Sequence, residues 1–388
     1  MAAASVKDGH SGGHVRDSST PGSFEDRGEP VQLLTPDGVR VEHSDFSFTG
    51  DDSLLVDFHR DMFMTRRLDR EATALQRQGE LGLWTPLLGQ EAAQIGSGHT
   101  VGRHDYVFPS YREHGVAWVI GLPPVDLLGL FRGTAMSGWD PAKYRFHPYT
   151  LVIGAQTLHA TGYAMAMQMD GLVGHEDPDT SGAVLAYFGD GAISQGDVNE
   201  SMVFAASYQA PVVFFCQNNQ WAISEPIERQ SRIPLYRRAT GFGIPSVRVD
   251  GNDALAVHAV TDWAMRHARS GQGPVMIEAF TYRMGAHTTA DDPTKYRLRE
   301  EEDHWRGRDP IARLETYLRS RDLLTDADLA DLEEQGDQLG VDLREGCRTL
   351  PEPDLARTFT ETYVEQTGEL TDQLEEYEAY AASFEGDA

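Results

Sequence analysis

The chain has 388 residues, 40% of them hydrophobic and 24% charged, which is enough apolar material for a large globular α/β domain with a sizeable core. Its net charge of −28 disfavours nucleic-acid binding, and it has no run of about 18 apolar residues that would span a membrane. Two cysteines, Cys216 and Cys347, are too few for a disulfide scaffold, so the composition is typical of a protein of the reducing cytoplasm.

The first part of the chain predicts a tail followed by a helix. Residues 1–30 contain no apolar segment and mix acidic with basic side chains, so we expect neither a secretory signal nor a transit peptide. A short extended piece follows, and we assign residues 1–50 to a disordered or extended N-terminal tail. Asp51, Asp52 and Ser53 can then cap a long helix whose apolar residues recur on one face.

The centre of the chain reads as a parallel α/β sheet. Four short apolar runs lack polar alternation, as expected of strands that are buried on both faces. They are residues 183–188, 212–216, 246–249 and 275–280. Helical stretches at 195–208 and 252–269 separate them, a pattern typical of parallel strands with crossover helices. A short strand at 105–109, a helix that opens at Pro123 and a helix at 155–168 come before them.

The remaining segments are predicted to be loops and surface helices. Residues 110–115 and 132–150 read as loops, and long loops of this kind are often functional. Residues 321–388 hold 20 acidic and four basic residues, which favours a solvated helical surface over a charge-steered docking face. We therefore divide the chain into an α/β domain at 51–300 and a helical acidic region at 301–388.

Polar residues end two of the predicted strands. Gly189, Asp190 and Gly191 follow one apolar run, and Asn218 and Asn219 follow the next, with 26 residues between the two groups. That distance fits one loop, one helix and one strand, so both groups lie at adjacent strand ends, where open parallel sheets bind ligands. A carboxylate and an amide oxygen, with a nearby backbone carbonyl, suit magnesium holding a phosphate. The glycines let the backbone approach a diphosphate closely.

This stretch resembles the thiamine diphosphate motif, in which GDG and NN stand about 26 residues apart. With its flanks, from about residue 55 to about residue 365, the chain is similar to the alpha subunit of the two-subunit 2-oxo acid dehydrogenases. The resemblance implies a thiamine diphosphate-binding fold: a mostly parallel sheet flanked by helices on both faces, with a helical C-terminal extension. It also implies that thiamine diphosphate and Mg²⁺ are the cofactors.

Individual site residues follow from the same resemblance. It implies magnesium ligation by Asp190, by Asn219 and by the backbone carbonyl of Trp221. It implies that the diphosphate is bound by the residues of the first turn and by one residue of the second strand. These are Gly189, Gly191, Ala192 and Gln217. Some relatives have arginine at the position of Gln217, so we expect a weaker phosphate contact here.

Three further segments match elements of this family. The YRE element places Tyr111 and Arg112 at the cofactor diphosphate, and a guanidinium fork suits that group. The segment VIGAQ places Ile153 beneath the bent cofactor. The loop that follows the last apolar run contains Arg283 and His287, which the resemblance makes catalytic: His287 for proton transfer and diphosphate binding, Arg283 for orienting the acyl acceptor.

The reaction and the partners are also expectations from the resemblance. They are oxidative decarboxylation of a 2-oxo acid and acyl transfer to lipoyl-lysine of an acyltransferase component. A beta subunit would complete the site with a glutamate, in a heterotetramer of two alpha and two beta chains. We favour a branched-chain substrate such as 3-methyl-2-oxobutanoate over pyruvate. A magnesium-dependent phosphate-binding module and a non-catalytic subunit stay open as alternatives, although the sequence has no GxxxxGK[ST] element.

Overall fold

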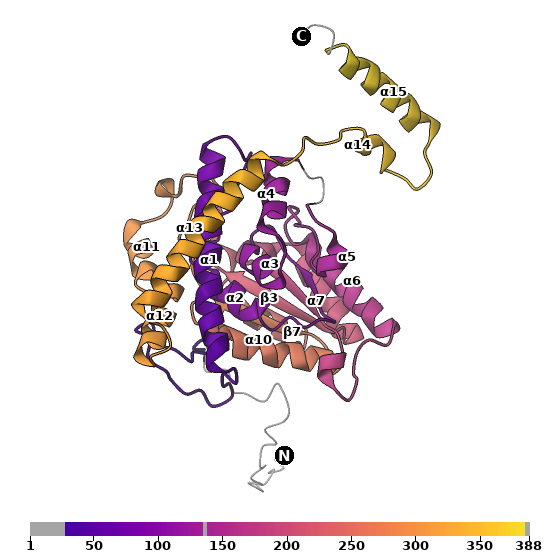
Figure 1. Ribbon diagram of the computed structural model, residues 1–388. Helices are drawn as coiled ribbons and strands as arrows, with labels where there is room; N and C mark the ends of the chain where they lie inside the picture. The colour runs from indigo at the N-terminus through magenta and orange to yellow at the C-terminus, as the bar shows by residue number, and fades with distance from the viewer. Residues whose placement is uncertain (1–27, 135–137, 385–388) are drawn as a thin grey trace, which may run out of the picture.

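The fold is a five-stranded parallel sheet with helices on both faces, seen in the computed structural model, which describes residues 28–134 and 138–384 (Figure 1). The strand order is β1-β2-β3-β7-β6, and all neighbouring pairs are parallel. The strands are β1 (Tyr106–Phe108), β2 (Val184–Gly189), β3 (Val212–Asn218), β6 (Ser246–Asp250) and β7 (Val275–Phe280). A small antiparallel pair, β4 (Trp221–Ala222) and β5 (Glu225–Pro226), lies outside this sheet. The α/β class expected from the sequence is confirmed.

Helices connect and cover the strands. They are α1 (Asp52–Arg77), α2 (Glu91–Gly98), α3 (His114–Ile120), α4 (Pro124–Arg132), α5 (Pro141–Tyr144), α6 (Ala155–Met169), α7 (Gly196–Tyr208), α8 (Ile227–Gln230), α9 (Tyr236–Thr240), α10 (Ala254–Arg269), α11 (Arg299–Arg306), α12 (Pro310–Ser320), α13 (Asp326–Arg348), α14 (Arg357–Thr360) and α15 (Gly368–Ala382). Short 3-10 helices are η1 (Pro178–Thr180), η2 (Asp190–Ser194) and η3 (Pro293–Lys295). Aspartate side chains cap several α-helices, among them Asp51 at α1 and Asp253 at α10.

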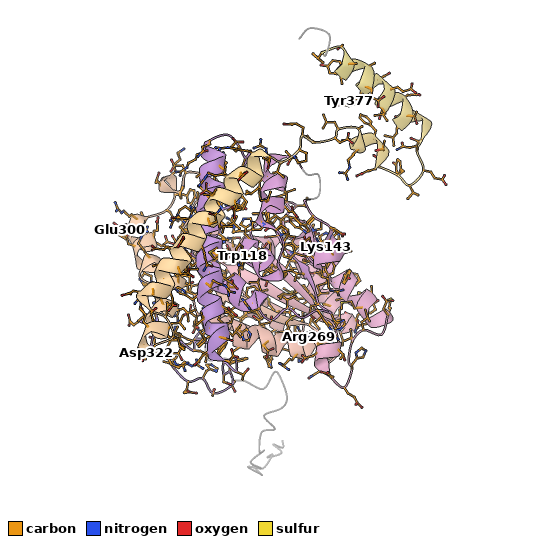
Figure 2. All side chains as sticks on the ribbon, in the orientation of Figure 1. Trp118, Lys143, Arg269, Glu300, Asp322 and Tyr377 are labelled. Atoms are coloured by element: carbon orange, nitrogen blue, oxygen red, sulfur yellow. The ribbon has the colours of Figure 1, made fainter. Side chains whose placement is uncertain are left out.

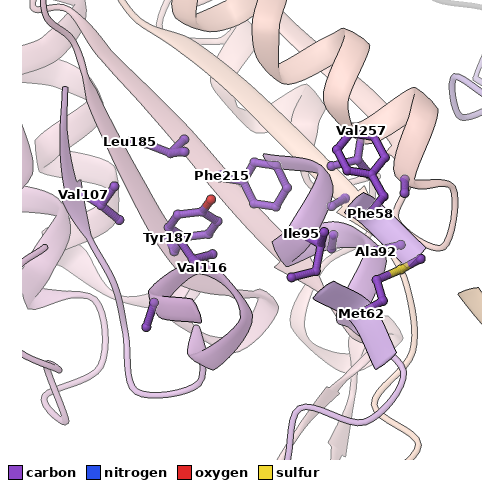
Figure 3. Packing of buried hydrophobic residues seen from close by; sticks show 14 of the residues in the cluster. Phe58, Met62, Ala92, Ile95, Val107, Val116, Leu185, Tyr187, Phe215 and Val257 are labelled. Atoms are coloured by element: carbon purple, nitrogen blue, oxygen red, sulfur yellow. The ribbon is translucent and has the colours of Figure 1, made fainter. Parts of the chain in front are cut away.

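Alternate strand residues divide the core into two layers. On one face, Tyr187 and Phe215 pack with residues of α1, α2 and α10, as Figure 3 shows for Phe58, Ile95 and Val257. On the other face, neighbouring strand residues pack against α6 and α7. That second cluster includes Val184, Ala186, Phe188, Phe214, Ala160, Ala164, Val198 and Met202. Because both faces are covered, the strands are apolar without alternation, as the sequence predicted.

The segment before α1 is extended and joins the core. Val31 bridges Val249 of β6: its N–H donates to the Arg248 carbonyl at 2.8 Å, and its carbonyl accepts from the Asp250 N–H at 2.9 Å. Leu33 is fully buried, and the neighbouring apolar residues Val31 and Leu34 are buried as well. Part of the predicted tail therefore acts as an additional edge of the sheet, although the division into domains stays a prediction.

A buried arginine joins this segment to α12 and to the sheet. Arg313 donates to the Asp250 carboxylate at 3.0 Å and to the Leu34 carbonyl, and lies 3.6 Å from the Asp253 carboxylate. We expect Arg313→Ala to lower the free energy of unfolding by about 3–5 kcal/mol, because two buried carboxylates lose their cation. Chemical denaturation measures it. Arg319→Ala on the same helix removes only exposed ion pairs and should cost at most about 1 kcal/mol. Equal losses in the two variants would contradict this account.

The C-terminal region divides into a packed part and a projecting part. Helix α13 packs along α1, with Leu343 and Cys347 in the core. Helices α14 and α15 project from this body (Figure 1), and Figure 2 labels Tyr377 on the projecting part. Tyr377 and Phe359 lie with ring centroids 5.6 Å apart, and α15 has no buried residue. The expectation of a solvated helical surface fits α15 but not the inner face of α13.

Two segments that were predicted to be loops contain helices. The loop assigned to residues 110–115 gives way to α3 at His114, where the Gly115 N–H donates to the Gln94 side chain at 2.8 Å. The predicted loop 132–150 contains α5, which begins at Pro141 because the side chain of Asp140 caps two N–H groups. Gln94 is 21 residues away from Gly115 along the chain. The contact that supports α3 is therefore not local, and sequence periodicity could not predict it.

Candidate active site

The carboxyl ends of β2, β3 and β7 meet at one edge of the sheet. Gly189 pairs with Gln217, and Gln217 pairs with Ala279, so the three strands end level with one another. A cavity of about 260 Å³ opens there, between these strand ends and the start of α6. All twelve site residues predicted from the sequence line it: Tyr111, Arg112, Ile153, Gly189, Asp190, Gly191, Ala192, Gln217, Asn219, Trp221, Arg283 and His287.

Asp190 supplies a buried carboxylate at the end of β2. Its side chain is 1% exposed and accepts a hydrogen bond from the Gln230 amide at 3.3 Å. Burial raises its pKa to about 6, while the positive charge of Arg283 offsets part of that rise. An anion that is deprived of water and of a direct ion-pair partner among the described residues is a favourable ligand for a cation.

The turn after β3 supplies two further oxygens. The Asn219 amide nitrogen donates to the Gln90 side chain at 3.0 Å, which fixes the orientation of the amide, and its oxygen accepts from the Trp221 N–H at 3.3 Å. The Trp221 carbonyl accepts from Arg283 at 2.7 Å. In the described part of the chain, no three His, Cys, Asp or Glu side chains cluster as a metal site. A metal here would therefore use one carboxylate with amide and carbonyl oxygens, which is hard-cation chemistry.

Gly191 brings the two turns into contact. A Cβ atom added there would lie 2.7 Å from the Cβ of Ala222, so a larger residue would push the turns apart. A Cβ at Gly189 would meet nothing within 4 Å. Of these two positions, only 191 therefore requires glycine for steric reasons. The first N–H groups of η2, around Gly191 and Ala192, have no acceptor within that helix and suit an anion.

Two guanidinium groups also line the cavity. Arg112 donates to the carbonyls of Pro86 and His287, the latter at 2.8 Å. Arg283 is fully buried and also donates to the Ile223 carbonyl at 2.8 Å. Burial and the charge of Arg112 lower the pKa of Arg283 to about 10, so it remains a cation at neutral pH. Two adjacent cations in a buried wall favour an anionic ligand such as a diphosphate.

His287 lies between these two arginines. Its Nδ1 is 3.3 Å from the Arg112 guanidinium and 3.4 Å from that of Arg283, and both groups are donors. Nδ1 is therefore the acceptor, and the ring hydrogen belongs on Nε2. Burial, followed by the charges of the two arginines, lowers its pKa to about 3, so the imidazole is neutral at pH 7. A bound anion would neutralise the arginines and raise that pKa.

Gln217 is engaged by residues that the sequence did not point to. Its amide nitrogen donates to Glu113 at 2.6 Å, and its oxygen accepts from the Gln94 amide at 3.1 Å. Burial raises the pKa of Glu113, and hydrogen bonds from Ser110 partly offset this. Gln217 therefore reaches the cavity with one N–H still free of these contacts. Glu113 is the third letter of YRE, the one signal that could have identified it.

The last predicted residues form the mouth of the cavity. Ile153 is 41% exposed, and Tyr111 lies edge-on to His287 with ring centroids 6.2 Å apart. Behind them, Gln156 donates to the Tyr187 carbonyl at 2.8 Å, and no donor among residues 28–134 and 138–384 reaches its buried amide oxygen. Gln156, with Ile223 and Gln90, also lines the cavity.

The loop that carries His287 is ordered by its own side chains. The His287 N–H donates to the Asp291 carboxylate at 2.8 Å, and Tyr296 donates to the same carboxylate. Tyr296 also accepts from Arg283 at 3.2 Å, and its ring lies 5.5 Å from that of Trp221. This network links the predicted catalytic loop to the turn with the predicted metal ligands.

The fold and the cavity are those of a parallel α/β protein whose sheet edge suits a cation together with an anionic group. Residues 59–339 match the family model described as "Dehydrogenase E1 component". The 3-methyl-2-oxobutanoate dehydrogenase subunit alpha of Mycobacterium tuberculosis is 43% identical over 91% of this chain and 95% of its own length. The pyruvate dehydrogenase E1 component subunits alpha of Acholeplasma laidlawii and Staphylococcus aureus are 36% and 38% identical, over 84% and 76% of this chain and 93% and 78% of their own. The chain belongs to the dehydrogenase E1 component family of thiamine diphosphate-dependent 2-oxo acid dehydrogenases.

Proposed function

We propose that the chain is the alpha subunit of an enzyme that oxidatively decarboxylates a branched-chain 2-oxo acid, such as 3-methyl-2-oxobutanoate, and transfers the acyl group to lipoyl-lysine of an acyltransferase component. The observation that carries the proposal is the convergence of the twelve predicted site residues on one cavity. The name of the 43% identical relative supports the branched-chain substrate. The names of two relatives at 36% and 38% identity keep pyruvate as the second candidate.

The residues present fit thiamine diphosphate held through Mg²⁺. When bound, the cofactor supplies the carbanion that adds to the oxo acid and the electron sink that accepts the electron pair when carbon dioxide leaves. In the proposed arrangement the metal ligands are Asp190, Asn219 and the Trp221 carbonyl. The groups that hold the diphosphate are Tyr111, Arg112, Gly189, Gly191, Ala192, Gln217 and His287. Ile153 would support the cofactor from the apolar side.

The chain's own residues then bind, orient and move protons. Arg112 and Arg283 are both buried, so their two positive charges would act strongly on an anionic ligand bound beside them. Burial, together with these charges, keeps His287 neutral until an anion arrives, after which its Nε2–H can donate and its raised pKa suits proton transfer. Arg283 is proposed to orient the acyl acceptor.

An exposed apolar rim supports a beta-subunit partner. Leu151, Val152 and Ile223 are 66%, 70% and 53% exposed beside the cavity. Helices α6 and α7 also carry exposed apolar residues, which include Tyr163, Met169, Val203, Phe204 and Tyr208. Exposed apolar side chains gathered beside a site favour an interface. We therefore propose that a beta chain covers this rim and completes the site, in a heterotetramer of two alpha and two beta chains.

The cellular location is proposed to be cytoplasmic. Both cysteines are buried and free, which suits a reducing compartment. In residues 28–134 and 138–384, no helix is long and apolar enough to cross a bilayer.

The test is reconstitution with a beta partner. We expect the purified pair to turn over 3-methyl-2-oxobutanoate faster than pyruvate when thiamine diphosphate and Mg²⁺ are present, and the chain alone to be inactive, because half of the site is missing. Decarboxylation assays with a panel of oxo acids measure it. Full activity of the chain alone would refute the half-site. A preference for pyruvate would select the second candidate. No thiamine diphosphate uptake, or ATP competing for it, would favour a phosphate-binding module, and uptake without turnover a non-catalytic subunit.

A further inference from the structure

The turn that carries two predicted metal ligands is strained. Gln220 has φ of 72° and Ile223 has φ of 57°, and both flank Trp221. Positive φ is uncommon outside glycine, and for a β-branched residue such as Ile223 it is an outlier. Such backbone costs of the order of 1–3 kcal/mol per residue and persists only where the surroundings impose it. The contacts of the turn therefore show which residues impose this strained backbone conformation.

Gln220 is tied in three directions. Its side-chain amide donates to the Thr281 carbonyl at 2.7 Å. Its backbone N–H donates to the Asn218 side chain at 3.1 Å, and its carbonyl accepts from the Ile227 N–H at 3.0 Å. The first of these contacts is the only one made by its side chain among the described residues, and it spans 61 positions along the chain.

This side-chain contact joins the turn after β3 to the loop that carries the proposed catalytic residues. Thr281 stands two residues before Arg283. The Thr281 N–H donates to the Asn218 carbonyl at 2.9 Å, and the Arg283 N–H donates to the Asn219 carbonyl at 3.2 Å. The Gln220 side chain adds a third hydrogen bond between the two segments, and it comes from the residue whose backbone is left-handed.

We propose that Gln220 is a positioning residue for the predicted magnesium site. Its amide holds the left-handed turn against Thr281, which follows β7, and in doing so sets where the Asn219 amide oxygen and the Trp221 carbonyl stand relative to Asp190. The inference rests on the proposed function, because the metal is that of the same site. Without the amide the turn relaxes, and the two oxygens lose their shared position before any ion arrives.

The chain contains a matched control for this residue. Gln209 also has a positive φ, 51°, and its side-chain amide also donates to a backbone carbonyl, that of Ala206 at 2.6 Å. It ends α7 and does not line the cavity. Gln209→Ala therefore reproduces the loss of a left-handed glutamine and its hydrogen bond without touching the proposed metal site.

The experiment titrates Mg²⁺ against the full-length chain, purified with its beta partner, at fixed thiamine diphosphate. Tryptophan fluorescence follows binding, and oxo acid decarboxylation gives kcat. We expect Gln220→Ala to raise the Mg²⁺ concentration at half-saturation about fivefold, as loss of one hydrogen bond implies, with kcat restored within about twofold at saturating Mg²⁺. Gln220→Gly should raise it similarly without loss of melting temperature, because glycine accepts the left-handed backbone. Gln209→Ala should leave half-saturation unchanged.

Three results would overturn the inference. Half-saturation that stays within about twofold of the unsubstituted chain in both Gln220 variants removes the positioning role while the proposed function stands. An equal rise in Gln209→Ala shows an effect of general stability. Absence of any Mg²⁺-dependent cofactor binding by the unsubstituted chain refutes the proposed function itself.

Discussion

Replacing Asp190 with asparagine is expected to weaken Mg²⁺-dependent thiamine diphosphate binding at least about 100-fold, the upper end of the loss caused by removing a mere supporting group at a metal site. Asp190 is the only carboxylate among the three proposed ligands, and it is 1% exposed. Asparagine keeps its shape and removes its charge, so the ion would meet only neutral oxygens. Titration calorimetry of the chain with its beta partner measures the loss.

Folding and metal binding separate cleanly in this variant. Burial penalises the ionised form of Asp190, so the uncharged asparagine should leave the unliganded protein at least as stable as before. Melting temperatures check this. Asp197→Asn, in the first turn of α7 and outside the cavity, removes an equal charge and should bind the cofactor normally. Cofactor affinity that is unchanged in Asp190→Asn would place the metal elsewhere.

Replacing His287 with alanine is expected to lower acyl transfer to lipoyl-lysine by at least about 100-fold, within the range of a lost acid–base group. The imidazole is the acceptor for both Arg112 and Arg283, at 3.3 and 3.4 Å, so its loss also frees two guanidiniums beside the ligand. Oxo acid decarboxylation with an artificial oxidant should fall less than transfer. Single-turnover acylation of a lipoyl domain separates the two.

The control for this variant is a histidine outside the cavity. His304→Ala on α11 removes an exposed imidazole and should leave both steps unchanged. Transfer that is unaffected by His287→Ala would remove this residue from the mechanism and leave Arg283 as the proposed catalytic group of the loop.

The sequence predicted the sheet well, because strands depend on local pattern, and the residues that it proposed for the site all line one cavity. The runs before Gly189 and Asn218 are β2 and β3, and parallel pairing brings their ends level. What it did not predict depends on contacts between distant residues. Glu113 lies against Gln217 across 104 positions, and Gln90 against Asn219 across 129. Neither hydrophobic periodicity nor motif spacing predicts contacts between residues so far apart along the chain.

The burial of the N-terminal segment was not predicted, for the same reason. Residues 31–34 look like a polar-flanked tail in sequence, since the partners that anchor them to the core, such as Arg248, Asp253 and Arg313, lie beyond residue 247. The hydrogen bonds from Leu33 and Leu34 to Asp253 form over separations of 220 and 219 residues. Propensity therefore described the backbone of this segment correctly, as extended, and said nothing about its burial.

These long separations have a consequence for the order of events during synthesis on the ribosome. Val31 needs β6 and Leu34 needs Arg313, so these apolar residues near the start of the chain wait for most of the polypeptide before they find their partners. Until then Leu33 and its neighbours remain available to chaperones, and to other nascent chains in a crowded cell.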